Sequence, residues 1–539
     1  MVHRREIVGL LLALLLPILA ACGGNGGNTG NTTTGSAAAS AGTTGGTTGG
    51  AATATTDAGT TGGTATTATA GAGTTGGAAT TATANTAGAG TAATTTGGTD
   101  ATTTAGGAGT DETATAAGGA DYSAWVGQQP SVDNAPEVFN ADQAKQYSGV
   151  QITYYGEASG IGLELSTALE QKFTEATGIQ IRHVPNPQSA TEYYSTLQRF
   201  FQGQSADVDA MMIDVIWPGA FAQHLADLGP ALGQDAQQHY PGIVENNTVD
   251  GKLVGIPFFG DFGMLYYRTD LLQKYGFNAP PQTWDELEQQ ARTIMDGEKA
   301  NDPQFSGFVF QGNAYEGLTC DALEWIASTT GHGFIENGQP MMNDPQVIEI
   351  LNRVKGWVGT IAPRGVTTYQ EEEARNAFQG GHAAFMRNWP YAYALGNAED
   401  SPVRGKFDVA PLPSANGQEP VGTVGGWQLA VSTYSKNQDA AIEFIRYMAS
   451  PEVQAYRAII GSFVPTIPMV AESAAVVETN PYLESVGNVQ RVTRPSRELG
   501  DRYNEGSTVV FQGVNQILNG QDAAAVVAQM DQRLQRLAR

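Results

Sequence analysis

The sequence predicts an α/β protein built as two lobes, and two observations point to this class. From Asp121 onwards, about 420 residues have the mixed composition of a folded protein, which exceeds the roughly 250–300 residues that one hydrophobic core normally serves. Within this part, short apolar runs typical of strands alternate with segments of helical spacing. Strand–helix–strand alternation favours mainly parallel sheets with helices on both faces.

The alternation is clearest at the start of the folded part. The expected order is strand 150–155, helix 163–176 ending at Gly178, strand 179–184, helix 191–201 and strand 210–216. Thr283 and Glu286 have the spacing of a capping box, which predicts that another helix starts there. The last ~100 residues have mostly helical spacing.

The first residues predict export and a lipid anchor. Arg4 and Arg5 precede an apolar run, residues 7–16, that is too short to span a bilayer comfortably. Leu-Ala-Ala-Cys follows at residues 19–22 and resembles the bacterial lipobox, whose cysteine is acylated and becomes the mature N-terminus. We therefore expect a signal peptide over 1–21 and lipidation of Cys22; an ordinary secretory signal is the alternative.

Residues 22–120 predict a disordered tether. After Cys22 this stretch is almost entirely Gly, Thr and Ala, without Pro, Lys, Arg or aromatic residues. Such a composition buries too little apolar surface to offset the entropy of the chain. As a flexible coil, the tether would have an end-to-end distance of roughly 50–60 Å, enough to hold a folded domain of residues 121–539 away from a membrane.

Charge and motifs exclude several classes of function. The formal net charge is −25, and the folded part is strongly acidic, which argues against nucleic acid as a partner. Two cysteines cannot build a disulfide framework or a cysteine-based metal site, and the six histidines show no metal-ligand spacing. No nucleophile elbow, zinc-protease motif or phosphate loop is present. Abundant Asp and Glu leave a paired-carboxylate glycosidase open.

Eight segments in a fixed order resemble one family from about Val150 to the C-terminus. They are KFTEATGI (172–179), IDVIW (213–217), GMLYYRTDLL (263–272), YEGL (315–318), FQGGHAAF (378–385), RNWPYA (387–392), VGGW (424–427) and AIEFI (441–445). Together they are similar to the extracytoplasmic solute-binding proteins of ABC importers, family 1, in the maltose- and trehalose-binding branch. The resemblance implies a periplasmic-binding-protein-like fold, in which two α/β lobes are joined by a hinge with the ligand cleft between them.

The resemblance also implies a sugar site. Sugars offer hydroxyl groups to carboxylates and apolar C–H faces to aromatic rings. By resemblance, the hydroxyl acceptors are Glu164, Asp214 and Asp261, the stacking platforms are Trp389 and Trp427, the Gly426 backbone lies close to the ligand, and Arg494 donates to sugar oxygens.

Four of these residues also have a structural interpretation. Asp214 ends an apolar strand and could cap the next helix, Asp261 could form a turn, Trp389 could belong to the core, and Arg494 could be part of an exposed basic face. Trp427 follows two glycines, which indicates an exposed setting. Two departures from close relatives leave the sugar open: Phe259 stands where they carry a tyrosine, and residues 193–195 lack their arginine.

The sequence thus predicts a sugar-binding lipoprotein of an ABC importer. It would capture a di- or oligosaccharide by closure of the lobes and deliver it to the transmembrane subunits of a permease. We expect an extracytoplasmic monomer anchored to the cell membrane, with no reaction, cofactor, metal or nucleic acid. A surface glycoside hydrolase and a sugar sensor without transport are the alternatives.

Overall fold

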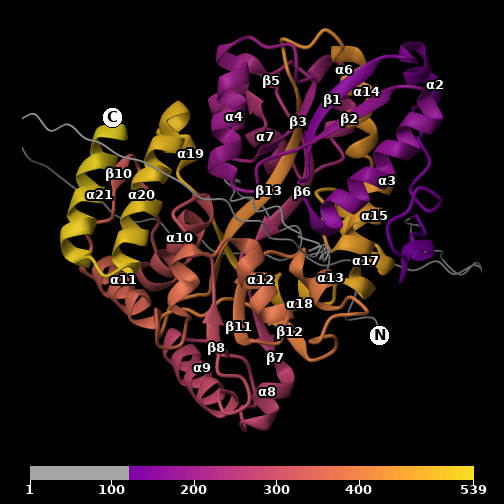
Figure 1. The fold of residues 1–539 in the computed structure, drawn as a ribbon. Coiled ribbons are helices and arrows are strands. Elements are labelled where there is room, and N and C mark those ends of the chain that lie inside the picture. Colours follow the sequence, from indigo (N-terminus) through magenta and orange to yellow (C-terminus); the bar gives the residue numbers. More distant parts are fainter. Residues whose placement is uncertain (1–119, 488, 539) are drawn as a thin grey trace, which may run out of the picture. The chain divides into compact units, whose positions relative to one another are not determined.

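The structure is a computed structural model that describes residues 120–487 and 489–538. The predicted signal peptide, the lipidated Cys22 and all but the last residue of the tether lie outside the described residues. The described part of the chain forms two α/β lobes, each around its own sheet (Figure 1). Both lobes belong to one compact unit.

Lobe 1 is built on a six-stranded sheet. Its strands are β1 (Gln151–Gly156), β2 (Gln180–Pro185), β3 (Ala210–Asp214), β6 (Ile256–Phe262), β13 (Val421–Val431) and β14 (Gln490–Val492). They follow the order β14-β13-β3-β1-β2, and β6 also pairs with β13. The helices are α2 (Ala141–Ala144), α3 (Gly160–Thr177), α4 (Ala190–Gln202), α5 (Pro218–Phe221), α6 (Gly229–Ala236), α7 (Pro241–Asn246), α14 (Gln438–Met448) and α15 (Pro451–Gly461). Helix α3 packs on β2, and α14 packs on β3 and β13.

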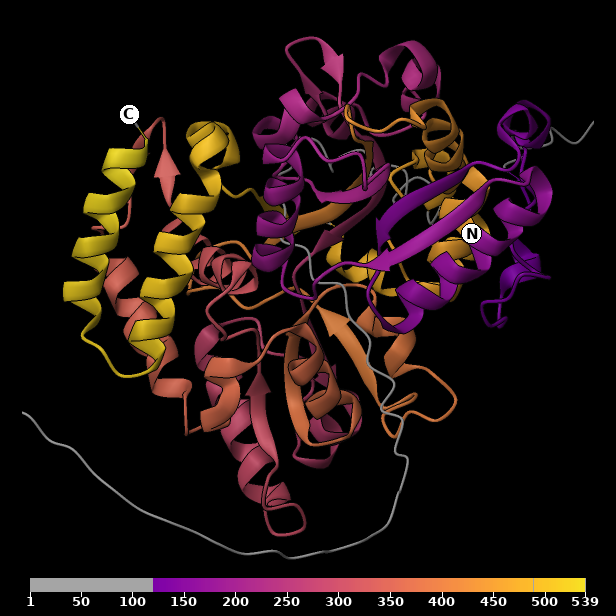
Figure 2. The ribbon, with the colours of Figure 1, turned by 45° about the horizontal axis from the view of Figure 1, so that its top comes forward.

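Lobe 2 is built on a four-stranded sheet of order β12-β7-β11-β8. These strands are β7 (Met264–Arg268), β8 (Ser306–Val309), β11 (Ala383–Asn388) and β12 (Phe407–Ala410). The helices around it are α8 (Thr269–Lys274), α9 (Trp284–Glu298), α10 (Glu316–Thr330), α11 (Pro345–Trp357), α12 (Glu371–Gln379), α13 (Ala392–Gly396), α18 (Tyr482–Val486), α20 (Tyr503–Leu518) and α21 (Ala523–Leu537). Figure 2 shows α20 and α21, in yellow, side by side next to α10 and α11.

Short elements complete the described part. They are the two-stranded pairs β4 (Thr248–Val249) with β5 (Lys252–Leu253) and β9 (Ile335–Glu336) with β10 (Gln339–Pro340), the helices α16 (Pro468–Ala471), α17 (Ala474–Thr479) and α19 (Ser496–Leu499), and the 3₁₀ turns η1 (Ser123–Trp125), η2 (Lys145–Tyr147), η3 (Ala222–His224), η4 (Arg364–Thr368) and η5 (Gly500–Arg502).

The expected elements of lobe 1 form within a few residues of their predicted bounds. Helix α3 ends at Gly178, whose φ of 80° lies in the left-handed region that glycine adopts without strain. Helix α9 begins with the predicted capping box, in which Thr283 and Glu286 satisfy each other's backbone N–H groups. The residues after about 440 are mostly helical, as expected.

The prediction of mainly parallel sheets is wrong in part. Strands β2, β1 and β3 are parallel, but β13 runs antiparallel to both β3 and β6. In lobe 2 only β11 and β8 are parallel, whereas β7 is antiparallel to β11 and β12. The reason is that the chain enters β7 and β13 directly from the other lobe, without the helical crossover that parallel neighbours need.

Two of the connections between the lobes meet beside Gly263. Strand β6 of lobe 1 continues into β7 of lobe 2 through the single residue Gly263, and the chain returns to lobe 1 between β12 and β13. The crossings touch, because the Gly263 N–H donates to the carbonyl of Thr423 at 3.2 Å. We call this contact the hinge, defined by Gly263 and residues 421–424.

Candidate functional site

Three of the predicted residues share one face of the lobe 1 sheet beside the hinge. In the strand register, Trp427 of β13 lies opposite Asp214 of β3, and Gly425 lies opposite Asp261 of β6. Side chains alternate between faces along a strand, so residues 425 and 427 and their cross-strand partners point the same way. The sheet therefore brings together Asp214, Asp261 and Trp427, with the side-chain-free Gly425 between them.

Asp261 is a buried carboxylate with spare hydrogen-bonding capacity. Its side chain is 4% exposed, and its Oδ1 atom has no hydrogen-bond partner among the described residues. Burial raises the pKa of the Asp261 carboxyl well above its usual range, and the charge of Asp214 raises it further, while Arg387 and Arg457 oppose the shift. Asp261 Oδ1 is one of several buried polar atoms without a partner among the described residues, and an unused acceptor is suited to a ligand's hydroxyl group.

Trp427 is buried rather than exposed, in contrast to the setting that the two preceding glycines indicated. It is 2% exposed and packs against Tyr193 and Trp217, with ring centroids 6.1 and 5.7 Å away. Its indole Nε1 has no acceptor among the described residues. Trp427 thus adds an unused donor to the same sheet face as the unused acceptor of Asp261.

Gly426 allows β13 to lie close to β6. Its φ is 130°, and a Cβ atom at this position would come within 2.4 Å of the Phe259 carbonyl oxygen. Any side chain would therefore collide with the backbone of β6 in a conformation that L-residues rarely adopt. This glycine sets the spacing of the strands that carry Asp261 and Trp427.

Asp214 and Arg494 contact each other instead of standing free. The Asp214 carboxylate accepts from Arg494 Nη2 at 3.0 Å and from the Ile216 backbone N–H at 3.4 Å. It does not cap the next helix, since α5 has Trp217 at its N-cap and no side-chain hydrogen bond there. Arg494 also pairs with Glu316, which in turn accepts from the hydroxyl groups of Tyr503 and Ser507. Sequence reasoning missed Glu316, although the segment YEGL that contains it was singled out.

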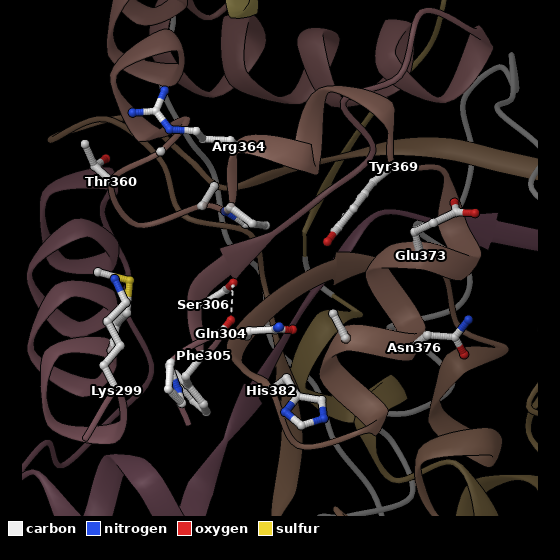
Figure 3. Close-up of a pocket in the computed structure, with 16 residues that line it drawn as sticks. Lys299, Gln304, Phe305, Ser306, Thr360, Arg364, Tyr369, Glu373, Asn376 and His382 are labelled. Atoms are coloured by element: carbon white, nitrogen blue, oxygen red, sulfur yellow. Dashed lines mark hydrogen bonds between the residues drawn. The ribbon is translucent and has the colours of Figure 1, made fainter. Parts of the chain in front are cut away.

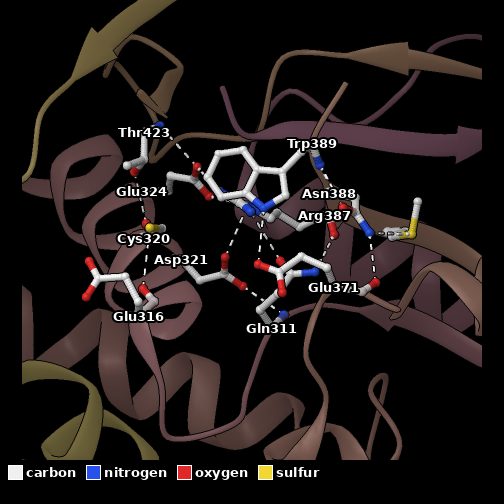
Figure 4. Close-up of polar contacts among 11 residues, drawn as sticks. Gln311, Glu316, Cys320, Asp321, Glu324, Glu371, Arg387, Asn388, Trp389 and Thr423 are labelled. Atoms are coloured by element: carbon white, nitrogen blue, oxygen red, sulfur yellow. Dashed lines mark hydrogen bonds and ion pairs between the residues drawn. The ribbon is translucent and has the colours of Figure 1, made fainter. Parts of the chain in front are cut away.

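Trp389 follows β11 in lobe 2 and is fully buried. Its indole Nε1 donates to Glu371 at 3.3 Å, and the guanidinium of Arg387 lies 3.8 Å from the ring centroid (Figure 4). The two predicted platforms, Trp389 and Trp427, therefore come from different lobes. Glu371 belongs to an acidic run that the sequence would place in a solvated helix start, yet its side chain is buried.

Glu164 is set apart from the other predicted residues. It is exposed on α3 and makes no hydrogen bond or ion pair with them in the described part of the chain. The buried carboxylate nearby is Glu157, which pairs with Arg457 and accepts from Ser166 at 2.6 Å. Because Arg457 acts electrostatically on Asp261, this pair forms the charged surroundings of the site.

The lobes touch at the N-terminus of α10. The Glu316 backbone N–H of lobe 2 donates to Thr191 Oγ1 of lobe 1 at 3.2 Å. The described cavity that reaches Asp261 and Gly425 has a volume of only 40 Å³, whereas ligand pockets commonly have about 300–1,000 Å³. The residues that line this cavity all belong to lobe 1, and the cavity as it stands is too small for a sugar.

A larger cavity of 660 Å³ lies elsewhere in lobe 2, between α9, α12 and the segment that follows α11 (Figure 3). It opens at the start of β8 and β11, whereas Trp389 follows the end of β11. Its polar residues include Lys299, Arg364 and His382, and none of the buried unpartnered atoms of the described residues lines it. It contains none of the predicted site residues.

None of the helices in the described part of the chain has both the length and the apolar character needed to cross a bilayer. Within residues 120–487 and 489–538, no cluster of three or more His, Cys, Asp and Glu side chains could hold a metal ion.

Comparison with known proteins identifies the family. The family described as bacterial extracellular solute-binding protein matches residues 163–455, more than half of the chain. The chain belongs to this family. Its predicted family and its bilobal fold are thereby confirmed, and as a solute-binding protein of an ABC transporter it belongs to a family of binding proteins rather than enzymes.

Three similar proteins illustrate the family. A probable ABC transporter-binding protein of Deinococcus radiodurans is 43% identical, over 70% of this chain and 91% of that protein. The structure of maltose-bound MalE3 of T. maritima has a TM-score of 0.68 and 35% identity, and the match covers 72% of this chain and 100% of that one. A probable amino-acid ABC transporter periplasmic-binding protein of Sinorhizobium fredii is 25% identical, over 60% of this solute-binding protein and 74% of the relative.

Proposed function

We propose that this solute-binding protein captures a di- or oligosaccharide of the maltose or trehalose type and delivers it to the transmembrane subunits of an ABC permease. The observation that carries the proposal is the pair of unused polar atoms on one sheet face. Asp261 Oδ1 is an acceptor and Trp427 Nε1 a donor, both buried at the hinge without partners among the described residues. A sugar hydroxyl can donate to one and accept from the other.

The aromatic residues support a sugar rather than a small anion. Trp427 of lobe 1 and Trp389 of lobe 2 offer indole rings from opposite lobes, and an apolar sugar face between them would bury area on both sides. Closure around such a ligand joins the lobes through contacts that neither lobe makes alone. The similarity to maltose-bound MalE3 supports the same ligand class.

Asp214, Arg494 and Gly426 take indirect parts in this proposal. Asp214 and Arg494 form an ion pair with each other. A ligand that binds either group would have to share it with, or take it from, its partner. Gly426 sets the strand spacing beneath the ligand. Glu164, which is exposed, would reach a sugar only at the outer end of the cleft.

The protein's place in the cell follows from its first residues. We propose that it is a monomer held outside the cytoplasm by a lipid on Cys22, since Leu-Ala-Ala-Cys follows a short apolar segment. Fractionation of cells grown with a labelled fatty acid tests the anchor. The Cys22→Ser variant should lose the label, and equal label in both proteins would refute lipidation.

A thermal-shift screen of mono-, di- and oligosaccharides, with amino acids included, tests the ligand class. Calorimetry on the best sugar then compares the wild type with Trp427→Ala, which removes a stacking face and a donor. We expect binding to weaken at least about tenfold, because stacking is worth about 0.5–1.5 kcal/mol beyond the buried area. The matched control is Trp357→Ala, since Trp357 is a buried tryptophan of lobe 2 that packs on Trp284 away from the site.

These measurements, with assays of sugar release and uptake, separate the proposed function from its alternatives. A shift by an amino acid and by no sugar would refute the sugar class, and unchanged affinity in Trp427→Ala would refute the site. Release of smaller sugars from a bound oligosaccharide would indicate the glycoside hydrolase. Sugar binding without sugar uptake by cells that carry the permease would indicate a sensor.

A further inference from the structure

The Trp389 ring is held from one side by an arginine. The guanidinium of Arg387 lies 3.8 Å from the centroid of the Trp389 indole, within the range of a cation–π contact (Figure 4). Both side chains are buried, at 1% and 0% exposure. Any displacement of Arg387 must therefore move or tilt the indole.

Arg387 is in turn fixed by a carboxylate on α10. Its Nε and Nη2 atoms donate to the two oxygens of Glu324 at 2.9 and 2.7 Å, and Nη1 donates to Gln311 at 3.2 Å. A bidentate contact of this kind sets the plane of the guanidinium as well as its position. Glu324 thus determines where Arg387, and with it the Trp389 ring, can lie.

The same carboxylate contacts both crossings of the hinge. The Oε1 atom that accepts from Arg387 also accepts from the Thr423 backbone N–H at 3.0 Å. At Gly263, a Cβ atom would come within 1.8 Å of this oxygen and within 2.6 Å of Arg387 Nη2. Both crossing segments therefore meet Arg387, the neighbour of the Trp389 ring, at one buried oxygen.

We propose that Glu324 and Arg387, the coupling pair, are positioning residues that link the Trp389 platform to the hinge. A sugar that stacks on Trp389 fixes the ring and, through Arg387 and Glu324, holds the hinge backbone in the closed arrangement. Conversely, rotation at Gly263 and Thr423 as the lobes open shifts the platform. The inference rests on the proposed function, which makes Trp389 a contact of the ligand.

Neutralising Glu324 should leave the fold intact. Asp321 Oδ1 lies 3.1 Å from Arg387 Nε, so the guanidinium keeps a buried carboxylate when Glu324 loses its charge. Glu324→Gln also keeps the shape of the side chain but cannot accept with both oxygens from Arg387. Gly263→Ala disturbs the same contact from the hinge side by steric overlap, without changing any charge.

The test measures sugar affinity and the distance between the lobes in the full chain. Fluorophores attached through click-reactive non-canonical amino acids at two exposed sites, Gln202 of α4 and Gln289 of α9, report that distance by energy transfer. We expect Glu324→Gln and Gly263→Ala each to bind the sugar at least about tenfold more weakly, in the usual range of coupling between sites. Both should show a smaller change in distance on addition of sugar, and an altered distance without it.

Two matched controls should behave like the wild type. Glu372→Gln removes a charge from another buried ion pair of lobe 2, in which Nε and Nη2 of Arg375 both donate to Glu372 Oε2 away from the hinge. Gly356→Ala adds a Cβ on α11 where nothing lies within 4 Å.

The outcomes separate this inference from the proposed function. If the wild type binds no sugar, the proposed function fails, while the distance in the ligand-free variants still tests the coupling pair. If Glu324→Gln and Gly263→Ala retain wild-type affinity and distances and lose only melting temperature, the pair serves stability alone and the inference is overturned. A loss of affinity of equal size in Glu372→Gln would overturn it as well.

Discussion

Asp261, which we propose binds the ligand, would lower the stability of the free protein. Its carboxyl group is buried, one of its oxygens has no partner among the described residues, and burial raises its pKa well above the usual range. Loss of solvation without a compensating hydrogen bond costs free energy, and this cost persists until a ligand supplies a donor. Under the proposed function, the sugar would supply that donor.

A pH series on Asp261→Asn tests this reading. Because the folded pKa is raised above the ordinary 3.8, ionisation favours the unfolded state, so stability from this group is present at low pH and lost as the pH rises through the folded pKa. Asparagine does not ionise, so the variant does not lose stability as the pH rises through this pKa. We expect the variant to melt a few degrees higher than the wild type at about pH 8, with the gap closing toward about pH 4, and to bind sugar at least about tenfold more weakly.

Differential scanning fluorimetry across this pH range, with calorimetry for the sugar, makes the measurement. The same change at the exposed Asp400 is the control and should alter neither property. A variant that melts below the wild type at every pH would show that Asp261 supports the fold, and the assignment would fail.

The predictability of the site differed from residue to residue. The motif VGGW pointed to Gly426 and Trp427, and the structure places both next to Asp214 and Asp261. The burial of Trp427 could not be read from its glycine neighbours, because Tyr193 and Trp217 come from other elements. Likewise, Arg494 meets Asp214 across 280 positions of the chain and Glu316 across 178, and no local pattern encodes such contacts.

Among the helices and strands, local sequence signals predicted where helices begin and end. The sequence did not predict the direction in which neighbouring strands pair. The glycine after α3 and the capping box of α9 act within a few residues, so both could be predicted from the sequence. The antiparallel course of β7 and β13 could not, since it depends on the chain entering each strand from the opposite lobe. Periodicity identifies a strand but carries no information on the direction of its neighbour.

The contact between α4 and α10 gives a prediction at this scale. Thr191→Ala removes the oxygen that accepts from the Glu316 N–H between the lobes, so the closed arrangement should lose about 1 kcal/mol. We expect sugar affinity to fall roughly fivefold, mainly through faster dissociation, with little change in melting temperature.

Stopped-flow release of the sugar measures this effect. Thr196→Ala serves as the control, because Thr196 lies on the same helix and its hydroxyl donates within α4, to the Glu192 carbonyl. Unchanged dissociation in Thr191→Ala would mean that the contact does not stabilise the closed lobes.

For the whole molecule, a deletion tests whether the N-terminal extension contributes to the stability or the sugar affinity of the folded part. The composition of residues 23–120 predicts no core, and all of them except Ala120 lie outside the described structure. A chain that begins at Asp121 should therefore keep the melting temperature and sugar affinity of the chain that begins at Cys22 with Cys22→Ser. A drop of many degrees in the shorter chain would show that residues 23–120 support the folded part.

The two crossings at the hinge also bear on how the chain is made and exported. Strand β3 finds its partner β13 only after about 200 further residues, so the lobe 1 sheet cannot be completed until most of the protein has been synthesised. Closing so long a loop is slow compared with local helix formation. If the predicted signal peptide directs export before the chain has folded, this long-range pairing would delay folding and leave time for export.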